Sequence, residues 1–187
     1  MKKFKAYKSF IQYSLFVIIC TCHFIGCEQR SEQPSHSESI VYEADTLFAI
    51  QDFEHLEVDG YVPAYRDEDR GAIAINSVEF PGEFGAVETV WRKRSGVYDI
   101  TIETIPEEDG ESTYRFIING EVKGEFVNPE TDSTFGYASH NWNGVEINPG
   151  DTIRVVSGTH SNNKIPENGG FAWARGRWST LIFQFSN

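Results

Sequence analysis

Apolar and polar residues alternate with a period of two over most of the chain beyond residue 40. Tyr98, Ile100 and Ile102 share one face of an extended segment, and Leu181 and Phe183 do so near the C-terminus. This spacing predicts β-strands, because successive side chains of an extended chain point to opposite faces. We expect strands near residues 47–58, 72–80, 86–92, 97–105, 113–119, 121–127, 144–147, 152–157 and 178–185.

The turn sequences between these segments favour antiparallel pairing. Asn119-Gly120 separates two predicted strands, and both residues tolerate the positive φ angles of a tight hairpin. Asn148-Pro149-Gly150-Asp151 separates two others, with a proline and a glycine at the central turn positions. No long segment has apolar residues at helical spacing. The pattern therefore predicts an all-β protein, an antiparallel β-sandwich of jelly-roll type.

The N-terminal segment has the pattern of an export signal. Four lysines within the first eight residues precede an apolar run at 13–19, and Phe24-Ile25-Gly26-Cys27 follows. This tetrapeptide resembles the lipobox of bacterial lipoproteins, which implies that Cys27 is the lipid-modified first residue of the mature protein. The alternative is a transmembrane anchor, but the apolar run is shorter than the roughly 20 residues that a spanning helix needs. We expect an outer-membrane lipoprotein, facing the periplasm or the cell surface.

These features divide the chain into three parts. Residues 1–26 form the predicted signal peptide, 27–39 a polar flexible tether, and 40–187 a single β-sandwich domain. The formal net charge is −12, and it becomes −16 once the four lysines of the signal are removed. Such an acidic protein repels nucleic acid, so we exclude nucleic acid as a partner. All three cysteines lie within residues 20–27, which excludes a disulfide or thiolate metal site in the domain.

Three long connections remain, at 59–71, 128–143 and 158–177, and long loops in compact domains are usually functional. The second holds aromatic rings among small polar residues, a composition suited to stacking on sugar rings and bonding their hydroxyl groups. The third adds a ring, amides and a guanidinium. For Trp142 the alternative is a ring that caps the edge of the sandwich. For the third connection it is that Arg175 and Arg177 satisfy carbonyl groups at that edge while Trp173 or Trp178 packs beneath. The candidate ligand-binding residues are Trp142, Trp173, Tyr137, His140, Asn141, Asn162 and Arg175.

Catalytic and metal-binding patterns are weak. The sequence contains no Gly-x-Ser-x-Gly or His-Glu-x-x-His motif, and its histidines are scattered. The acidic segment 106–112 offers oxygen ligands of the kind calcium prefers, but a solvated turn is the favoured interpretation. We expect a protein that is not an enzyme and needs no cofactor.

Several segments resemble known carbohydrate-binding modules. Residues 48–54, 96–100, 118–121 and 147–151, with the final strand, are similar to the galactose-binding-like β-sandwich of family-six and family-thirty-five modules. Residues 70–76, 109–115, 160–167 and 174–178 are closer to modules appended to agarases and other polysaccharide-degrading enzymes of Bacteroidetes. The resemblance implies a structural calcium ion, but Gln51 and Ser179 stand where calcium-binding relatives have acids.

The resulting hypothesis is non-catalytic binding of a polysaccharide by a lipid-anchored module, near glycan-degrading or importing machinery. Trp142, Tyr137 and Trp173 would stack on sugar rings, and the remaining candidates would bond hydroxyl groups or an acidic substituent. Two alternatives stay open: a structural or protein-binding outer-membrane lipoprotein, and a small polysaccharide lyase or hydrolase.

Overall fold

The computed structural model describes residues 43–133 and 136–186. The predicted signal peptide, the tether and Cys27 lie outside the described residues. Within the described part of the chain, no helix is long and apolar enough to cross a membrane.

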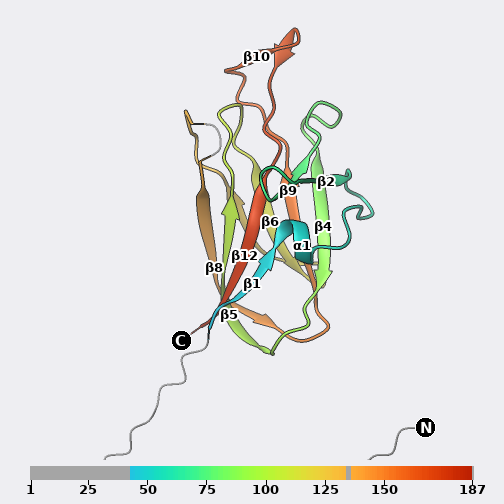
Figure 1. Ribbon diagram of the computed structural model, residues 1–187, viewed down its shortest axis with the longest axis vertical. Helices are drawn as coiled ribbons and strands as arrows, with labels where there is room; N and C mark the ends of the chain where they lie inside the picture. The colour runs from blue at the N-terminus through green and yellow to red at the C-terminus, as the bar shows by residue number, and fades with distance from the viewer. Residues whose placement is uncertain (1–42, 134–135, 187) are drawn as a thin grey trace, which may run out of the picture. The chain divides into compact units, whose positions relative to one another are not determined.

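Two antiparallel sheets form the sandwich (Figure 1). The first sheet contains, in spatial order, β2 (Ala64–Asp67), β3 (Ala72–Ile75), β12 (Trp178–Phe185), β5 (Gly96–Thr104) and β8 (Ala138–Ile147), and β1 (Asp45–Phe48) also pairs with β12. The second sheet contains β4 (Phe84–Val90), β9 (Thr152–Gly158), β6 (Thr113–Ile118) and β7 (Glu121–Val127). The predicted all-β antiparallel sandwich is confirmed.

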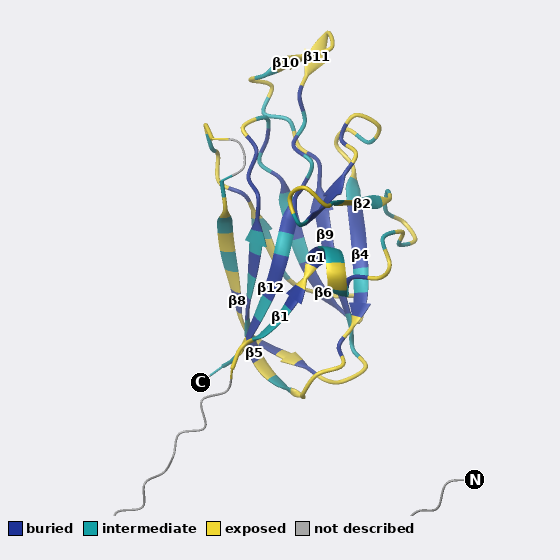
Figure 2. Cartoon of the chain, viewed as in Figure 1, coloured by how far each residue is buried: buried dark blue, intermediate teal, exposed yellow. Residues whose placement is uncertain are grey.

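The two sheets enclose an aromatic-rich core. Buried positions lie along strands of both sheets (Figure 2). Tyr98, Ile100 and Ile102 of β5 are fully buried, as period-two spacing predicted. Phe183 of β12 packs against Trp91 with ring centroids 4.6 Å apart. Burial of this apolar surface, at roughly 25 cal/mol per Å², is the main force that holds the sheets together.

Both predicted turns are present. Asn119 (φ 49°) and Gly120 (φ 84°) connect β6 to β7, and Gly150 (φ 96°) lies in the turn between β8 and β9. The Asn119-Gly120 turn joins the paired antiparallel strands β6 and β7, as the sequence predicted. The turn at Gly150 instead connects β8 of the first sheet to β9 of the second, so the antiparallel pairing expected across it is wrong.

Several predicted boundaries are wrong. The expected strand 47–58 is the short β1 followed by the helical turn α1 (Ala49–Asp52), where the Asp52 carboxylate accepts a hydrogen bond from the Phe48 amide at 2.7 Å. β3 ends at Ile75, five residues before the predicted end. β8 begins at Ala138 instead of 144. The connections expected to be loops also contain β2 and a hairpin of β10 (Pro166–Glu167) and β11 (Gly170–Phe171).

The strand order gathers four connections at one end of the sandwich, which we call the loop end. They join β3 to β4 (76–83), β5 to β6 (105–112), β7 to β8 (described at 128–133 and 136–137) and β9 to β12 (159–177). The β10–β11 hairpin projects from this end, whereas the start of β1 and the end of β12 lie at the opposite end (Figure 1). The loop end therefore brings together segments that are far apart in the sequence.

Candidate functional site

A buried ion-pair network supports the loop end. The Arg177 guanidinium pairs with the Glu107 carboxylate and, through Nε, with Asp67 Oδ2 at 2.7 Å. The second Glu107 oxygen accepts a hydrogen bond from the Arg175 amide at 2.7 Å. Burial raises the pKa of Glu107, while Arg177 and the Arg175 amide oppose this rise. Glu107 was expected in a solvated turn; it is buried instead, because its carboxylate pairs with Arg177 and the Arg175 amide of the connection 159–177, and Arg177 in turn pairs with Asp67 of β2.

A chain of neutral hydrogen bonds continues this network into the core. Tyr114 Oη donates to the Arg177 carbonyl oxygen at 2.9 Å and accepts from Asn128 Nδ2 at 3.2 Å. Thr104 Oγ1 donates to Asn128 Oδ1 at 2.6 Å. Because these groups are buried and paired, they fix the backbone of the loops that they reach.

Thr159 holds the loop 76–83. Its hydroxyl donates to the Phe80 carbonyl oxygen at 2.9 Å and accepts from the Glu83 amide at 3.0 Å. Its own amide donates to the Glu83 carbonyl oxygen at 2.9 Å. This loop is therefore anchored to the start of the long connection 159–177.

On one side of loop 76–83 lies a groove with two aromatic rings, which we call the Trp173 groove. Its volume is about 170 Å³. Trp173 is half-buried, and its ring lies over Gly82, where an added Cβ would be 3.5 Å from the ring. Phe171 is 45% exposed on β11. The groove is lined by Ser77, Val78, Pro81, Glu167, Asn168, Phe171 and Trp173.

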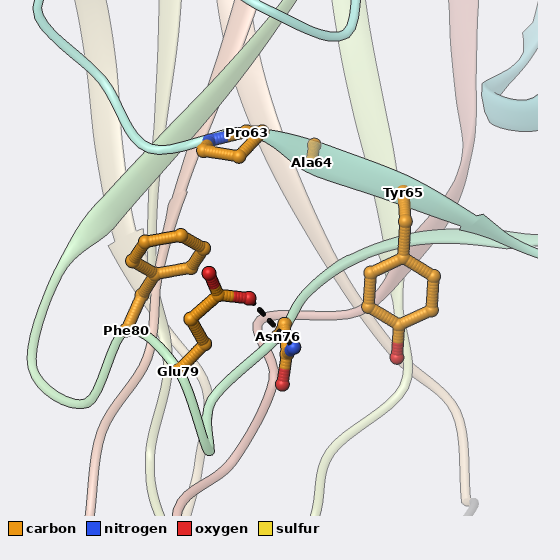
Figure 3. Close-up of a pocket in the computed structure, with 6 residues that line it drawn as sticks. All are labelled: Pro63, Ala64, Tyr65, Asn76, Glu79 and Phe80. Carbon is orange, nitrogen blue, oxygen red and sulfur yellow. Dashed lines mark hydrogen bonds between the residues drawn. The ribbon is translucent and has the colours of Figure 1, made fainter.

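A second and larger hollow, the Tyr65 groove, lies between β2 and the same loop. Its volume is about 380 Å³, within the range of roughly 300–1,000 Å³ for small-molecule sites. Figure 3 shows Asn76 and Glu79 between the rings of Tyr65 and Phe80, with Asn76 Nδ2 donating to Glu79 Oε2 at 3.2 Å. Pro63 and Ala64 complete the lining.

Sequence reasoning missed the Tyr65 groove. The predicted strand 72–80 would have given Asn76, Glu79 and Phe80 alternating faces of a sheet, whereas β3 ends at Ile75 and these residues form a turn. The Pro81-Gly82 pair is a turn signal that indicated an earlier end of the strand.

The structure corrects the assignment of Trp142. It lies on β8, not in a loop, and is 7% exposed. Its ring stacks on Phe116 at 5.4 Å between centroids, with the ring planes 16° apart. The proposed role as a sugar platform is therefore wrong for this ring, because its faces are packed in the core.

His140 and Asn141 point to opposite faces of β8, as adjacent strand residues must. His140 stacks on Phe126 at 4.5 Å, and burial lowers the pKa of its imidazole. Asn141 is exposed on the other face and donates to Thr101 Oγ1 at 3.1 Å. The two side chains therefore do not converge on one ligand.

Two other candidates belong to the framework of the loop end. Asn162 Nδ2 donates to the Glu108 carbonyl oxygen at 2.9 Å, which ties two loops together. The Arg175 guanidinium lies 3.7 Å from the Glu107 carboxylate. Tyr137, by contrast, is 76% exposed and immediately precedes β8. Of the seven predicted ligand-binding residues, Trp173 alone lines one of the two grooves.

The residues near α1 do not fit the calcium ion that the resemblance implies. The Arg66 guanidinium donates to the carbonyl oxygens of Ile50 and Phe53, both at 2.9 Å, so a cationic side chain already satisfies these groups. Gln51 is exposed and carries no charge. In residues 43–133 and 136–186, no group of three or more His, Cys, Asp or Glu side chains could hold a metal ion.

Comparison with known proteins shows the fold. No protein-family model matches the chain. Protein P23 of Formosa agariphila is 32% identical over 114 residues, which are 59% of this chain and 25% of that protein. The chain thus corresponds to a quarter of the length of this relative.

Solved structures of carbohydrate-binding modules are similar to the chain. The CBM36-1 domain of a multidomain xylanase from the hindgut metagenome of Trinervitermes trinervoides superposes with a TM-score of 0.50 at 17% identity, covering 78% of this chain and 99% of the domain. The C-terminal CBM6 of LamC, a marine laminarinase from Zobellia galactanivorans, gives a TM-score of 0.45 at 13% identity, covering 76% of this chain and 99% of that module. The chain has the β-sandwich fold of the CBM36-1 domain, which confirms the resemblance at the level of fold.

Proposed function

We propose that this chain is a non-catalytic module that binds a polysaccharide at its loop end. The observation that carries the proposal is the pair of grooves on either side of loop 76–83, each lined by aromatic rings together with a carboxylate and an amide. Aromatic faces stack on the apolar faces of sugar rings, while amide and carboxylate groups bond their hydroxyl groups. The fold shared with the CBM36-1 domain supports the same function.

The fixed loops explain how shallow grooves hold a hydrated ligand. Each hydrogen bond to a sugar hydroxyl contributes only about 0.5–1.5 kcal/mol net, because water is displaced from both partners. Ordering one flexible residue costs a similar amount, about 1–2 kcal/mol. Because Thr159 already holds loop 76–83 in place, binding does not have to order this loop. The favourable free energy of stacking on Trp173 and Tyr65 is therefore not spent on ordering and contributes to affinity.

Attachment to the outer membrane through a lipidated Cys27 is part of the proposal. In the described residues the chain enters the sandwich at β1, at the end opposite the loop end. Acyl chains contribute about 0.8 kcal/mol per buried methylene, and two or three chains hold a protein stably. Cys27→Ala should move the protein from the membrane fraction to the soluble fraction. Pelleting of this variant after a salt wash would contradict lipid anchoring.

Replacement of Trp173 tests the binding site. Trp173→Ala should weaken retention in a polysaccharide affinity gel at least tenfold, about 1.4 kcal/mol, because a central stacking ring is lost. The control is Phe48→Ala, which removes a ring that is 48% exposed but lines neither groove. Both variants should remain folded by circular dichroism, and neither should release reducing ends from the polysaccharide. Equal retention of the two variants would refute the assignment of Trp173 to the polysaccharide-binding site.

A further inference from the structure

We propose that the ligand is an uncharged polysaccharide whose internal segment crosses loop 76–83 and occupies both grooves. This inference rests on the proposed function and names the class of its ligand. A single loop, 76–83, separates the two grooves. Asn76, Glu79 and Phe80 face the Tyr65 groove, whereas Ser77, Val78 and Pro81 face the Trp173 groove.

The rigidity of this loop sets the spacing between the grooves. The Phe80 amide donates to the Asn76 carbonyl oxygen at 2.9 Å, and Thr159 holds the other side of the loop. A chain that fills one groove therefore presents its neighbouring sugars to the other at a high effective concentration. An internal segment of a polymer gains from both grooves, whereas a chain end confined to one groove does not.

The charges around the grooves select against anionic glycans. Among the described residues that line them, none is Lys, Arg or His, and each groove contains a carboxylate, Glu79 or Glu167. Nearby cations are already engaged: Arg175 pairs with Glu107, and Lys164 pairs with Glu130. A sulfate or uronate group bound here would face like charge without a counter-ion, and the net charge of −12 adds to the repulsion. The hydroxyl groups of a neutral sugar instead donate hydrogen bonds to the same carboxylates.

Affinity gels with matched pairs of polymers test the ligand class. Laminarin, agarose, xylan and hydroxyethylcellulose are each used unmodified and after chemical sulfation, so that the backbone is the same within a pair. The wild-type protein should be retained by at least one neutral polymer and at least tenfold less by its sulfated form. The double substitution Glu79→Gln with Glu167→Gln should reduce this discrimination. The control Glu121→Gln removes the charge of an exposed carboxylate at the β6–β7 turn. It should leave the discrimination between the neutral and the sulfated polymer unchanged.

Variants of the two grooves test the chain path. On the neutral polymer that retains the wild type, Tyr65→Ala should weaken retention at least fivefold and Trp173→Ala at least tenfold. Short oligosaccharides of that polymer should bind more weakly than long ones until both grooves are filled. Equal retention by the sulfated form, or no effect of Tyr65→Ala, would overturn this inference and leave the proposed function intact. Absence of retention on every polymer would overturn the proposed function as well.

Discussion

Trp142 allows a sharp test of whether a ring belongs to the core or to a binding surface. Its side chain is almost completely buried and stacks on Phe116. Truncation of a buried Trp or Phe to Ala typically costs about 3–5 kcal/mol, from lost transfer free energy and the remaining cavity. We therefore expect Trp142→Ala to lower the free energy of unfolding by about 3–5 kcal/mol, measured by urea denaturation.

A milder substitution separates stability from binding. The indole N–H of Trp142 is buried and has no hydrogen-bond partner in the described part of the chain. An unpaired buried donor costs roughly 1–3 kcal/mol, so Trp142→Phe removes this penalty while losing some packing. We expect Trp142→Phe to change the free energy of unfolding by less than about 1.5 kcal/mol and to leave polysaccharide retention unchanged.

Gly124 provides a second measurement of the same contact. A methyl group at Gly124 would overlap the Trp142 ring, so Gly124→Ala forces the ring or the strand to shift. This overlap should cost about 1–3 kcal/mol in the wild-type background and much less in Trp142→Ala. The double-mutant cycle should therefore give a coupling of about 0.5–3 kcal/mol. Normal stability of Trp142→Ala together with loss of retention would refute the core assignment.

Three further predictions concern the loop end, β8 and calcium. Arg177→Ala should reduce the free energy of unfolding by about 3–5 kcal/mol in urea denaturation, because it leaves Glu107 buried without its guanidinium partner; a change below 1 kcal/mol would contradict this network. Because burial lowers the pKa of His140, the unfolded state binds a proton more readily below about pH 6.5, so stability should fall as the pH drops below that value. The fall in the urea midpoint between pH 7.5 and 5.5 should be smaller in His140→Phe, and equal falls would contradict the assignment. Chelator and millimolar calcium should shift the melting temperature by less than about 2 °C, whereas a rise of several degrees with calcium would reveal a bound ion.

The strands were predictable where the local pattern alone decides the outcome. Apolar and polar residues alternate strictly from Tyr98 to Glu103 of β5, and Leu181 and Phe183 of β12 are buried two residues apart, since one face of each strand packs in the core. In β8 the same alternation is present, with His140 and Trp142 between polar neighbours. The abundance of small polar residues there resembled a binding loop, although the period of two was the better guide.

The grooves were less predictable because they depend on distant pairing. Tyr65 reaches its groove because β2 pairs with β3, and β3 in turn pairs with β12 through Ile73 and Trp178. No local pattern around Tyr65 indicates that it faces Asn76 and Glu79. The position of Trp173 outside the core was predictable, because a Trp in a long connection among glycines and amides has few strand neighbours to pack against.

The position of the buried ion pair indicates why the loop end retains it. A buried salt bridge adds little net stability, because desolvation of both ions offsets much of their attraction, and apolar side chains often serve as well. The Arg177–Glu107 pair, however, lies where β2, loop 105–112 and the connection 159–177 meet, and its directional hydrogen bonds set the positions of their backbones. Ligand affinity that arises from a few stacking contacts depends on such preorganisation, since each loop residue ordered on binding would cancel about one hydrogen bond. Substitutions of Arg177 that preserve the fold should therefore weaken polysaccharide binding without touching either groove.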